Sequence, residues 1–268
     1  GRPGWHIECS VMALKYLGPG FDFHGGGSDL IFPHHENEVA QSEAATGSTF
    51  VRYWVHNGFI NMGGEKMAKS VGNITRVRDL IEEYPGPAIR YYILSTHYRS
   101  PLDFRLEDMP GAVRGWKRLV NLKQNLDRIL VGKEITPPQE LSAAAKEFQT
   151  TLTKHRQAFE AAMNDDFNTA RAIGVLFDLA RDLNSYMAGG AENDERAAML
   201  AAGRNLLLVL GDVLGLLGAE EGHQDQAVVD GLIQLVAELR QAARARKDYD
   251  TADRVRQRLA ELGIVLED

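Results

Sequence analysis

Two patterns follow one another along this chain: strands, glycine breaks and helices alternate over the first 75 residues, and almost every later segment is helical. Apolar residues recur at the spacing of one helix face over residues 5–17. Residues 21–23 and 53–60 have the composition of strands, glycines at 25–27 predict a break, and residues 34–46 predict a helix. This alternation predicts a parallel α/β sheet in the first part of the chain.

The later helices are expected over 77–84, 87–96, 106–130, 143–163, 168–186, 195–217, 228–247 and 251–262. Short connections between long amphipathic helices favour an antiparallel bundle over 105–218. We therefore predict an α/β part at 1–75, a helical connector at 76–104, the bundle at 105–218 and a small region at 226–268.

Composition excludes several classes of protein. A hydrophobic content of 44% and a charged content of 25% are those of an ordinary soluble globular protein, with no apolar run of membrane-spanning length. One cysteine cannot form an internal disulfide, which favours a reducing cytoplasm. The chain starts without methionine and close to a candidate metal ligand, so we expect it to be part of a longer protein.

Cys9, His34 and Glu38 offer a thiolate, an imidazole and a carboxylate, which zinc accepts as ligands. His34 and Glu38 are four residues apart and share one face of the expected helix, while Cys9 lies on another helix. His35 is the neighbouring alternative ligand, but it is expected to point about 100° away from that face. A buried apolar thiol beside two surface residues is the simpler interpretation of the spacing alone.

Two glycine-rich segments suggest nucleotide contacts. Gly25, Gly26 and Gly27 allow a ligand to approach the backbone, and Asp29 would accept hydrogen bonds from ribose hydroxyls. An ordinary tight turn explains the same glycines equally well.

Lys66 and Lys69 lie on a loop bracketed by glycines. Such a loop can close on a triphosphate and stabilise the charge of a leaving pyrophosphate. Without further context, a solvated basic turn is the commoner explanation of paired lysines.

Taken together, these segments resemble cysteinyl-tRNA synthetase, a class I aminoacyl-tRNA synthetase. The resemblance is carried by GWHIECS at 4–10, GGGSDL at 25–30, FPHHENE at 32–38 and NDDFNTA at 164–170. KMAKS at 66–70 matches the KMSKS signature of the family, with Ala68 replacing its first serine. The resemblance implies the C-terminal half of a Rossmann-type catalytic domain, followed by a helix bundle and a small, incomplete anticodon-binding region.

The resemblance also implies a reaction and its participants. L-cysteine would be activated with ATP and Mg²⁺ to cysteinyl-adenylate and passed to the 3′ end of tRNA-Cys, with one Zn²⁺ per subunit selecting the cysteine thiolate. The protein would be a cytoplasmic monomer without membrane contact. The implied site residues are Cys9, His34 and Glu38 for zinc, Trp5 and His6 for cysteine, Gly25, Gly26, Gly27, Asp29 and Lys69 for ATP, and Lys66 and Lys69 for catalysis.

Two features of the family are missing from the sequence: its HIGH signature and a second cysteine that would be the fourth zinc ligand. Both are expected in a preceding N-terminal half, so these 268 residues alone are expected to be inactive. Two alternatives stay open: a related ATP-dependent cysteine ligase that acts on an amino sugar, as in mycothiol synthesis, and a non-catalytic tRNA-binding fragment. Residues 240–258 have a local net charge of +4 within a chain of −7, which favours tRNA as the acceptor.

Overall fold

The computed structural model divides the chain into two units, Gly1–Ala219 and Glu220–Asp268, and each is described by itself. It describes residues 4–62, 65–66, 75–133, 135, 140–189, 193–218, 235–236, 238–240, 242–243 and 248–261. Within these residues no helix is both long and apolar enough to cross a membrane.

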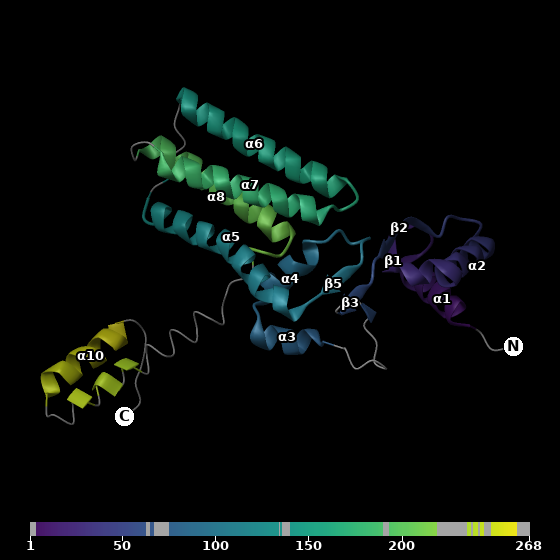
Figure 1. Cartoon of the computed structure of the whole chain (residues 1–268), viewed down its shortest axis with the longest axis horizontal. Helices are drawn as coiled ribbons and strands as arrows, with labels where there is room; N and C mark the ends of the chain where they lie inside the picture. Colours follow the sequence, from purple (N-terminus) through teal and green to yellow (C-terminus); the bar gives the residue numbers. More distant parts are fainter. Residues whose placement is uncertain are drawn as a thin grey trace. The chain divides into compact units, whose positions relative to one another are not determined.

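The first unit begins with the predicted α/β arrangement. Helix α1 (Trp5–Leu17) is followed by strand β1 (Phe21–Gly27), helix α2 (Glu36–Thr46) and strand β2 (Val51–Asn57). β1 and β2 pair in parallel, with Phe21 opposite Val51 and Gly27 opposite Asn57, and α2 forms the crossover that a parallel pair requires. α1 and α2 lie side by side against this strand pair (Figure 1). The predicted parallel sheet and both helices are confirmed.

The predicted strand break at the three glycines is wrong, because they form the end of β1 and pair with β2. A Cβ atom on Gly26 would lie 2.9 Å from Cε1 of His35, and one on Gly27 would lie 2.5 Å from Oδ1 of Asp29. The His35 ring, from the segment after the strand, leaves no room for a Cβ atom at Gly26, so close packing and not a turn accounts for glycine there.

The strand predicted at 53–60 is divided between two sheets. β2 ends at Asn57, and β3 (Ile60–Met62) pairs in parallel with β5 (Leu102–Phe104) and antiparallel with β4 (Glu65–Lys66). A Cβ atom on Gly58 would lie 2.5 Å from the carbonyl of Ser100, so the returning chain packs directly on this glycine. β5 is too short for a pattern of alternating residues to predict it.

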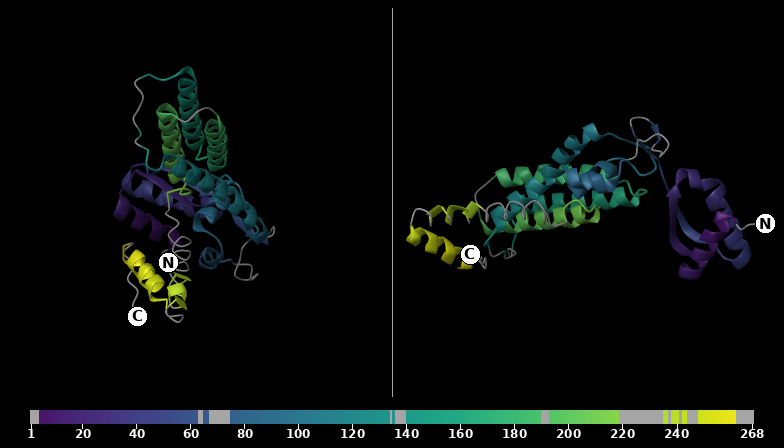
Figure 2. Two further views of the ribbon diagram at one scale, coloured as in Figure 1. Left: turned by 90° about the vertical axis from the view of Figure 1, so that its left-hand side faces the viewer. Right: turned by 90° about the horizontal axis from the view of Figure 1, so that it is seen from below.

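The remainder of the first unit is helical, as predicted, with ends that differ by a few residues. Helices α3 (Val77–Glu83) and α4 (Gly86–Leu94) precede the bundle of α5 (Met109–Leu130), α6 (Ala143–Asn164), α7 (Thr169–Ala188) and α8 (Asp194–Val213). The four long helices lie side by side (Figures 1 and 2). Their shared core is leucine-rich and includes the buried Trp116, whose Nε1 donates a hydrogen bond to the carbonyl of Leu216 at 2.9 Å.

The turn between α6 and α7 connects the bundle to the preceding segments. Asp166 and Phe167 have left-handed backbones, with φ of 54° and 53°, which non-glycine residues seldom adopt. Asp166 accepts hydrogen bonds from Arg99 and from the hydroxyl of Tyr98 (2.6 Å), and the Phe167 ring lies 6.3 Å from that of Phe23 in β1. These contacts hold the strained turn in place.

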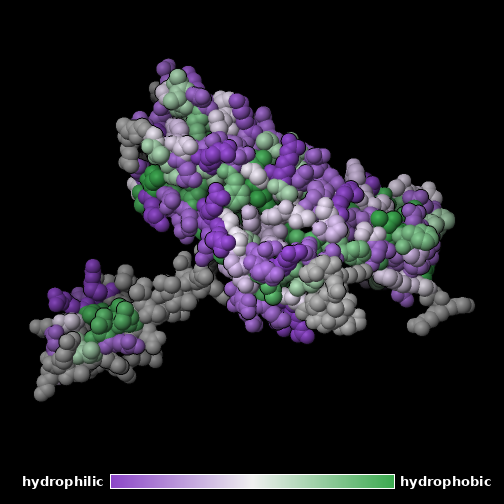
Figure 3. All heavy atoms as spheres, viewed as in Figure 1, coloured by the Kyte–Doolittle hydropathy of each residue, from purple (hydrophilic) through white to green (hydrophobic). Residues whose placement is uncertain are grey.

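In the second unit, α10 (Tyr249–Glu261) confirms the last predicted helix. Oδ1 of Asp248 accepts a hydrogen bond from the backbone N–H of Thr251 at 3.2 Å, as an N-terminal cap does. On the face shown in Figure 3, polar and apolar residues are interspersed over the described part of each unit. The boundaries of the four predicted parts stay predictions.

Candidate metal centre

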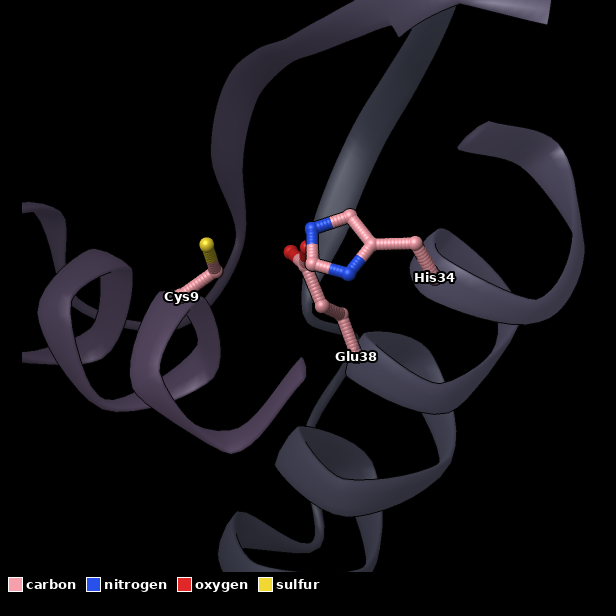
Figure 4. Close-up of side chains that lie close together, drawn as sticks. All are labelled: Cys9, His34 and Glu38. Atoms are coloured by element: carbon pink, nitrogen blue, oxygen red, sulfur yellow. The ribbon is translucent and has the colours of Figure 1, made fainter. Parts of the chain in front are cut away.

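The three predicted metal ligands lie together. Cys9 projects from α1, His34 lies in the tight turn Ile31–His35 that precedes α2, and Glu38 is in the first turn of α2. One ligand atom from each of the three side chains lies within 4.8 Å of the other two (Figure 4). The sequence predicts His34 and Glu38 on one face of a single helix, but α2 begins at Glu36 and His34 lies in the irregular turn before it. Their role as metal ligands stays a prediction.

Glu38 is the most unusual side chain of this cluster, because it is a carboxylate with no solvent exposure. Its Oε1 lies 2.7 Å from Nε2 of His34, yet neither oxygen accepts a well-directed hydrogen bond from any described residue. Burial raises the pKa of Glu38 to about 7. A buried carboxylate without hydrogen bonds is costly unless a cation compensates it.

Trp5 and His6 surround His34, which is itself buried. The indole of Trp5 stacks on the His34 imidazole with ring centroids 4.0 Å apart, and Nδ1 of His6 lies 2.7 Å from Nδ1 of His34. Burial, and next the neighbouring His6, lower the pKa of His34 and favour the neutral imidazole that binds metals. Trp5 and His6 therefore both lie directly beside the cluster.

Cys9 is partly exposed. Burial and the Glu38 carboxylate raise the pKa of its thiol, while a hydrogen bond from Trp5 opposes that change. A thiol with a raised pKa stays protonated at neutral pH unless a metal displaces the proton. Without a cation, Cys9 therefore carries a neutral thiol. Only a bound metal would convert it to the thiolate that acts as a ligand.

The residues present fit a zinc ion. Zinc binds sulfur at about 2.3 Å and nitrogen or oxygen at about 2.0 Å, so tetrahedral ligand atoms lie roughly 3.5 Å apart. The observed limit of 4.8 Å needs only small side-chain movements to reach that spacing. Two anionic ligands would neutralise the cation, and three ligands leave one tetrahedral position for a further group.

One sequence expectation about this site is wrong. His35 was expected to point away from Glu38, but His24, His35 and Glu38 form a second group whose ligand atoms lie within 4.8 Å of one another. The turn Ile31–His35 is not a regular α-helix, so the 100° rotation per residue does not apply to it. Burial lowers the pKa of His35 to about 4.

The sequence analysis did not identify His24 and His56. Nε2 of His24 lies 3.3 Å from Oε2 of Glu38, and Nε2 of His56 lies 2.8 Å from Nδ1 of His35. His24 lies on β1 and His56 on β2, and the parallel pairing of these two strands brings both side chains to the cluster.

The predicted ATP residues are only partly described. The three glycines end β1, and Asp29 follows in an exposed turn, so they lie at the carboxyl end of a parallel strand, where α/β folds bind ligands. The backbone of Lys66 is in β4, so it is not part of an irregular loop. The side chain of Lys66 and all of Lys69 lie outside the described residues.

Two protein-family models match the chain. The model for the class I tRNA synthetase (C) catalytic domain matches residues 1–114, and the DALR domain model matches residues 158–218. The first match includes the whole Cys9–His34–Glu38 cluster, and the second includes α7 and α8 of the bundle.

Curated relatives match the chain along its entire length. A cysteine–tRNA ligase of Moorella thermoacetica is 52% identical and one of Pelotomaculum thermopropionicum is 49% identical, each over 100% of this chain. The match covers 56% and 57% of those proteins, so the chain spans little more than half the length of these relatives.

Solved structures of class I synthetases share the fold. Methionyl-tRNA synthetase of Mycobacterium tuberculosis, in complex with methionyl-adenylate, matches 78% of this chain and 46% of its own with a TM-score of 0.59 and 21% identity. LeuRS of Agrobacterium radiobacter matches 75% of this chain and 28% of its own, with the same TM-score and identity. Along its entire length the chain is therefore similar to part of the cysteine–tRNA ligases, and it shares the fold of class I aminoacyl-tRNA synthetases.

Proposed function

We propose that the protein carrying this chain ligates cysteine to tRNA-Cys: it joins L-cysteine to ATP, releases pyrophosphate and passes the cysteinyl group to the 3′ end of the tRNA. The observation that carries this proposal is the clustering of Cys9, His34 and Glu38 beside Trp5 in a chain that matches cysteine–tRNA ligases over its entire length. Because the chain spans about half of its relatives, the proposal concerns the whole protein.

Selection of cysteine is the step for which the cluster is suited. Cysteine and serine differ by one atom, which shape alone discriminates poorly. A zinc ion held by Cys9, His34 and Glu38 would bind the substrate sulfur as a thiolate and leave the serine hydroxyl unbound. Trp5, which is 56% exposed, would cover the substrate while its stacking on His34 keeps that ligand in place.

The ATP site would lie at the carboxyl end of β1. The glycines there would let the adenosine approach the backbone, and the Asp29 carboxylate would accept hydrogen bonds from the ribose. Lys66 and Lys69 would stabilise the charge that develops on the α-phosphate and the leaving pyrophosphate, with Mg²⁺ on the phosphates. The position of Asp29 directly after the strand supports this arrangement.

The helical part would hold the tRNA. The DALR match at 158–218 and the basic stretch at 240–258 support contacts with the anticodon arm. Unpaired bases in such a loop can be stacked and read at their edges. The monomeric, cytoplasmic state expected from the sequence belongs to this proposal.

The test compares the effects of three substitutions on zinc binding by the whole protein: two at proposed ligands and one at a control glutamate. Cys9→Ser and Glu38→Gln should weaken zinc binding by more than the roughly 100-fold typical for loss of an outer partner. Glu8→Gln removes an exposed carboxylate whose charge is the least of the influences on the pKa of the Cys9 thiol, so it should change zinc binding far less than either ligand variant.

The assays are zinc affinity by chelator competition and cysteine-dependent pyrophosphate exchange against serine. Selectivity for cysteine should fall with zinc binding in the two ligand variants. Unchanged zinc content in Cys9→Ser would contradict the site. Transfer to an amino sugar in place of tRNA would show that the reaction is that of the related cysteine ligase.

The expectation that these 268 residues alone do not activate cysteine is also proposed. It is supported by the greater length of the relatives, in which the match covers 56% of the protein. Pyrophosphate exchange by this chain in isolation would overturn it.

A further inference from the structure

The turn between α6 and α7 is fastened to the segment that follows α4. Asp166 of the turn accepts a hydrogen bond from the hydroxyl of Tyr98 at 2.6 Å and forked hydrogen bonds from the guanidinium of Arg99, whose Nη2 lies 3.0 Å from Oδ1. Asp166 and its neighbour Phe167 keep left-handed backbones, which persist only where the surroundings impose them. We call these four residues, Tyr98, Arg99, Asp166 and Phe167, the joint.

The joint also contacts the strands of the α/β part. The carbonyl of Tyr98 accepts a hydrogen bond at 2.7 Å from the backbone N–H of Gly58, the first residue after β2. The Phe167 ring lies 6.3 Å from that of Phe23 in β1, and the Phe23 ring in turn stacks on Tyr53 of β2 at 5.6 Å. The joint therefore connects the turn of the bundle to both strands of the parallel pair.

Both helices of the α6–α7 hairpin run away from the joint. α6 ends at Asn164 and α7 begins at Thr169, and α6 has 22 residues, so its far end lies roughly 33 Å from the turn. A rotation of about 10° at the joint would move that far end by roughly 6 Å. The transfer of a group between two bound substrates tolerates far less, since a misplacement of about 1 Å can cost roughly 100-fold in rate.

We propose that Tyr98 and Arg99 are positioning residues for the transfer step: by holding the α6–α7 turn against the end of β2, they set the direction in which the bundle presents a bound tRNA to the α/β part. The inference rests on the proposed function and adds to it the residues that align the tRNA with the activated cysteine. An exposed pair such as Arg99–Asp166 adds little to stability, but a forked guanidinium–carboxylate pair fixes the direction of the groups that it joins.

A direct contact between Arg99 and a tRNA phosphate is the competing interpretation, because this side chain is 54% exposed. Both oxygens of Asp166 already accept hydrogen bonds from the guanidinium, and their charge opposes the approach of a phosphate. The two interpretations also differ in what a substitution changes. A phosphate contact controls the affinity for tRNA and its salt dependence, whereas an aligning pair controls the rate of transfer within the bound complex.

The test replaces Arg99 in the whole protein. Arg99→Met breaks both bonds to Asp166 and keeps a long side chain. It should slow single-turnover transfer of cysteine to tRNA-Cys by about 10- to 100-fold, and it should leave the tRNA dissociation constant, its salt dependence and pyrophosphate exchange without tRNA within about threefold of the unaltered protein. Tyr98→Phe removes one donor and should slow transfer less, with the other three quantities equally unchanged.

Arg105 supplies the matched control. Its guanidinium donates two hydrogen bonds to Oδ2 of Asp103, at 2.8 and 2.6 Å, and is 52% exposed, but this partner is only two residues away in the same segment. Arg105→Met should leave all four quantities unchanged. Arg99→Met combined with Asp166→Asn should transfer cysteine no more slowly than the slower single variant, because both substitutions break one pair. Near-ultraviolet circular dichroism identifies variants that fail to fold.

Three results would overturn the proposal: an unchanged transfer rate in folded Arg99→Met, a loss of tRNA affinity that accounts for its effect, or additive losses in the double variant. Failure of the proposed function gives a different result. If the unaltered whole protein does not charge tRNA-Cys, the ligase activity is wrong and this inference falls with it. A protein that charges tRNA-Cys equally well with Arg99 and with Met in its place keeps the ligase activity and loses only the role of the joint.

Discussion

The proposed role of Lys69 in adenylate formation predicts how its loss should affect the reaction rate and cysteine binding. Lys69→Ala should slow cysteinyl-adenylate formation by roughly 100- to 1000-fold, because it removes one preorganised charge from the developing pyrophosphate. Its effect on cysteine binding should be small, since the lysine would not contact the amino acid. Single-turnover measurements of adenylate formation and of the cysteine dissociation constant separate the two effects.

Lys15→Ala is the control, because Lys15 is an exposed lysine near the end of α1. It should leave both quantities unchanged. Equal losses of rate and of cysteine affinity in Lys69→Ala would contradict a role confined to the transition state.

Single residues also show what the sequence could predict of the site. The donor types and spacing of Cys9, His34 and Glu38 allow a zinc site, but it was the resemblance to a known family that favoured this interpretation over a buried thiol. His24 and His56 were not predictable, because no local spacing connects them to Glu38. Their contacts arise from the register of β1 with β2, which only the folded sheet determines.

At the scale of the helices, replacing either of two glycines with alanine should have opposite effects on the free energy of unfolding. A Cβ atom on Gly203 of α8 would lie 2.4 Å from Cδ2 of Leu183, a side chain with no solvent exposure. Gly203→Ala should therefore lower the free energy of unfolding by about 1–3 kcal/mol through overpacking. Urea denaturation measures the change.

Gly174 of α7 is the matched control, because nothing lies within 4 Å of a Cβ atom built there. Gly174→Ala should raise the free energy of unfolding by up to about 1 kcal/mol, since alanine is the better helix former. Similar effects of the two substitutions would show that α7 and α8 do not pack as described.

The turn between α6 and α7 predicts a pH dependence. Hydrogen bonds from Arg99, and then from Tyr98, lower the pKa of Asp166 to about 2. An unfolded aspartate titrates near pH 4, so the stabilisation from this carboxylate is complete above about pH 4 and is lost as the pH falls through about 2. Asp166→Asn removes the charge but keeps a residue that tolerates a left-handed backbone.

The unaltered protein should be the more stable above pH 4, and its advantage over Asp166→Asn should close toward pH 2. Urea denaturation across this range measures it. Asp22→Asn breaks an exposed pair with Arg52, at 3.2 Å, and should have little effect at any pH. A stability difference that persists undiminished at pH 2 would contradict the role of Asp166.

The helices among the described residues were predicted to within a few residues, because a buried face imposes a period that the sequence records. Most of the helix predicted over 228–247 lies outside the described residues. Strands were predicted less well for two physical reasons. The ladder with β2 extends β1 through three glycines that local propensity marks as a break. Long-range pairing with β3 makes a strand of Leu102–Phe104, which is too short to show a pattern.

At the scale of the whole molecule, this chain would supply three ligands of the proposed metal centre and spans little more than half the length of its relatives. Its one cysteine is one of those three proposed ligands, so any second protein thiolate would come from another part of the protein. That fourth ligand stays a prediction. The activity proposed here is therefore a property to measure in the whole protein.

Zinc-edge X-ray absorption of the whole protein, with and without L-cysteine, tests the metal centre most directly. The account predicts sulfur scattering at about 2.3 Å that increases by one sulfur when cysteine is added, does not increase with serine, and decreases in Cys9→Ser. A zinc environment that does not change on addition of cysteine, or that is the same in Cys9→Ser, would contradict it.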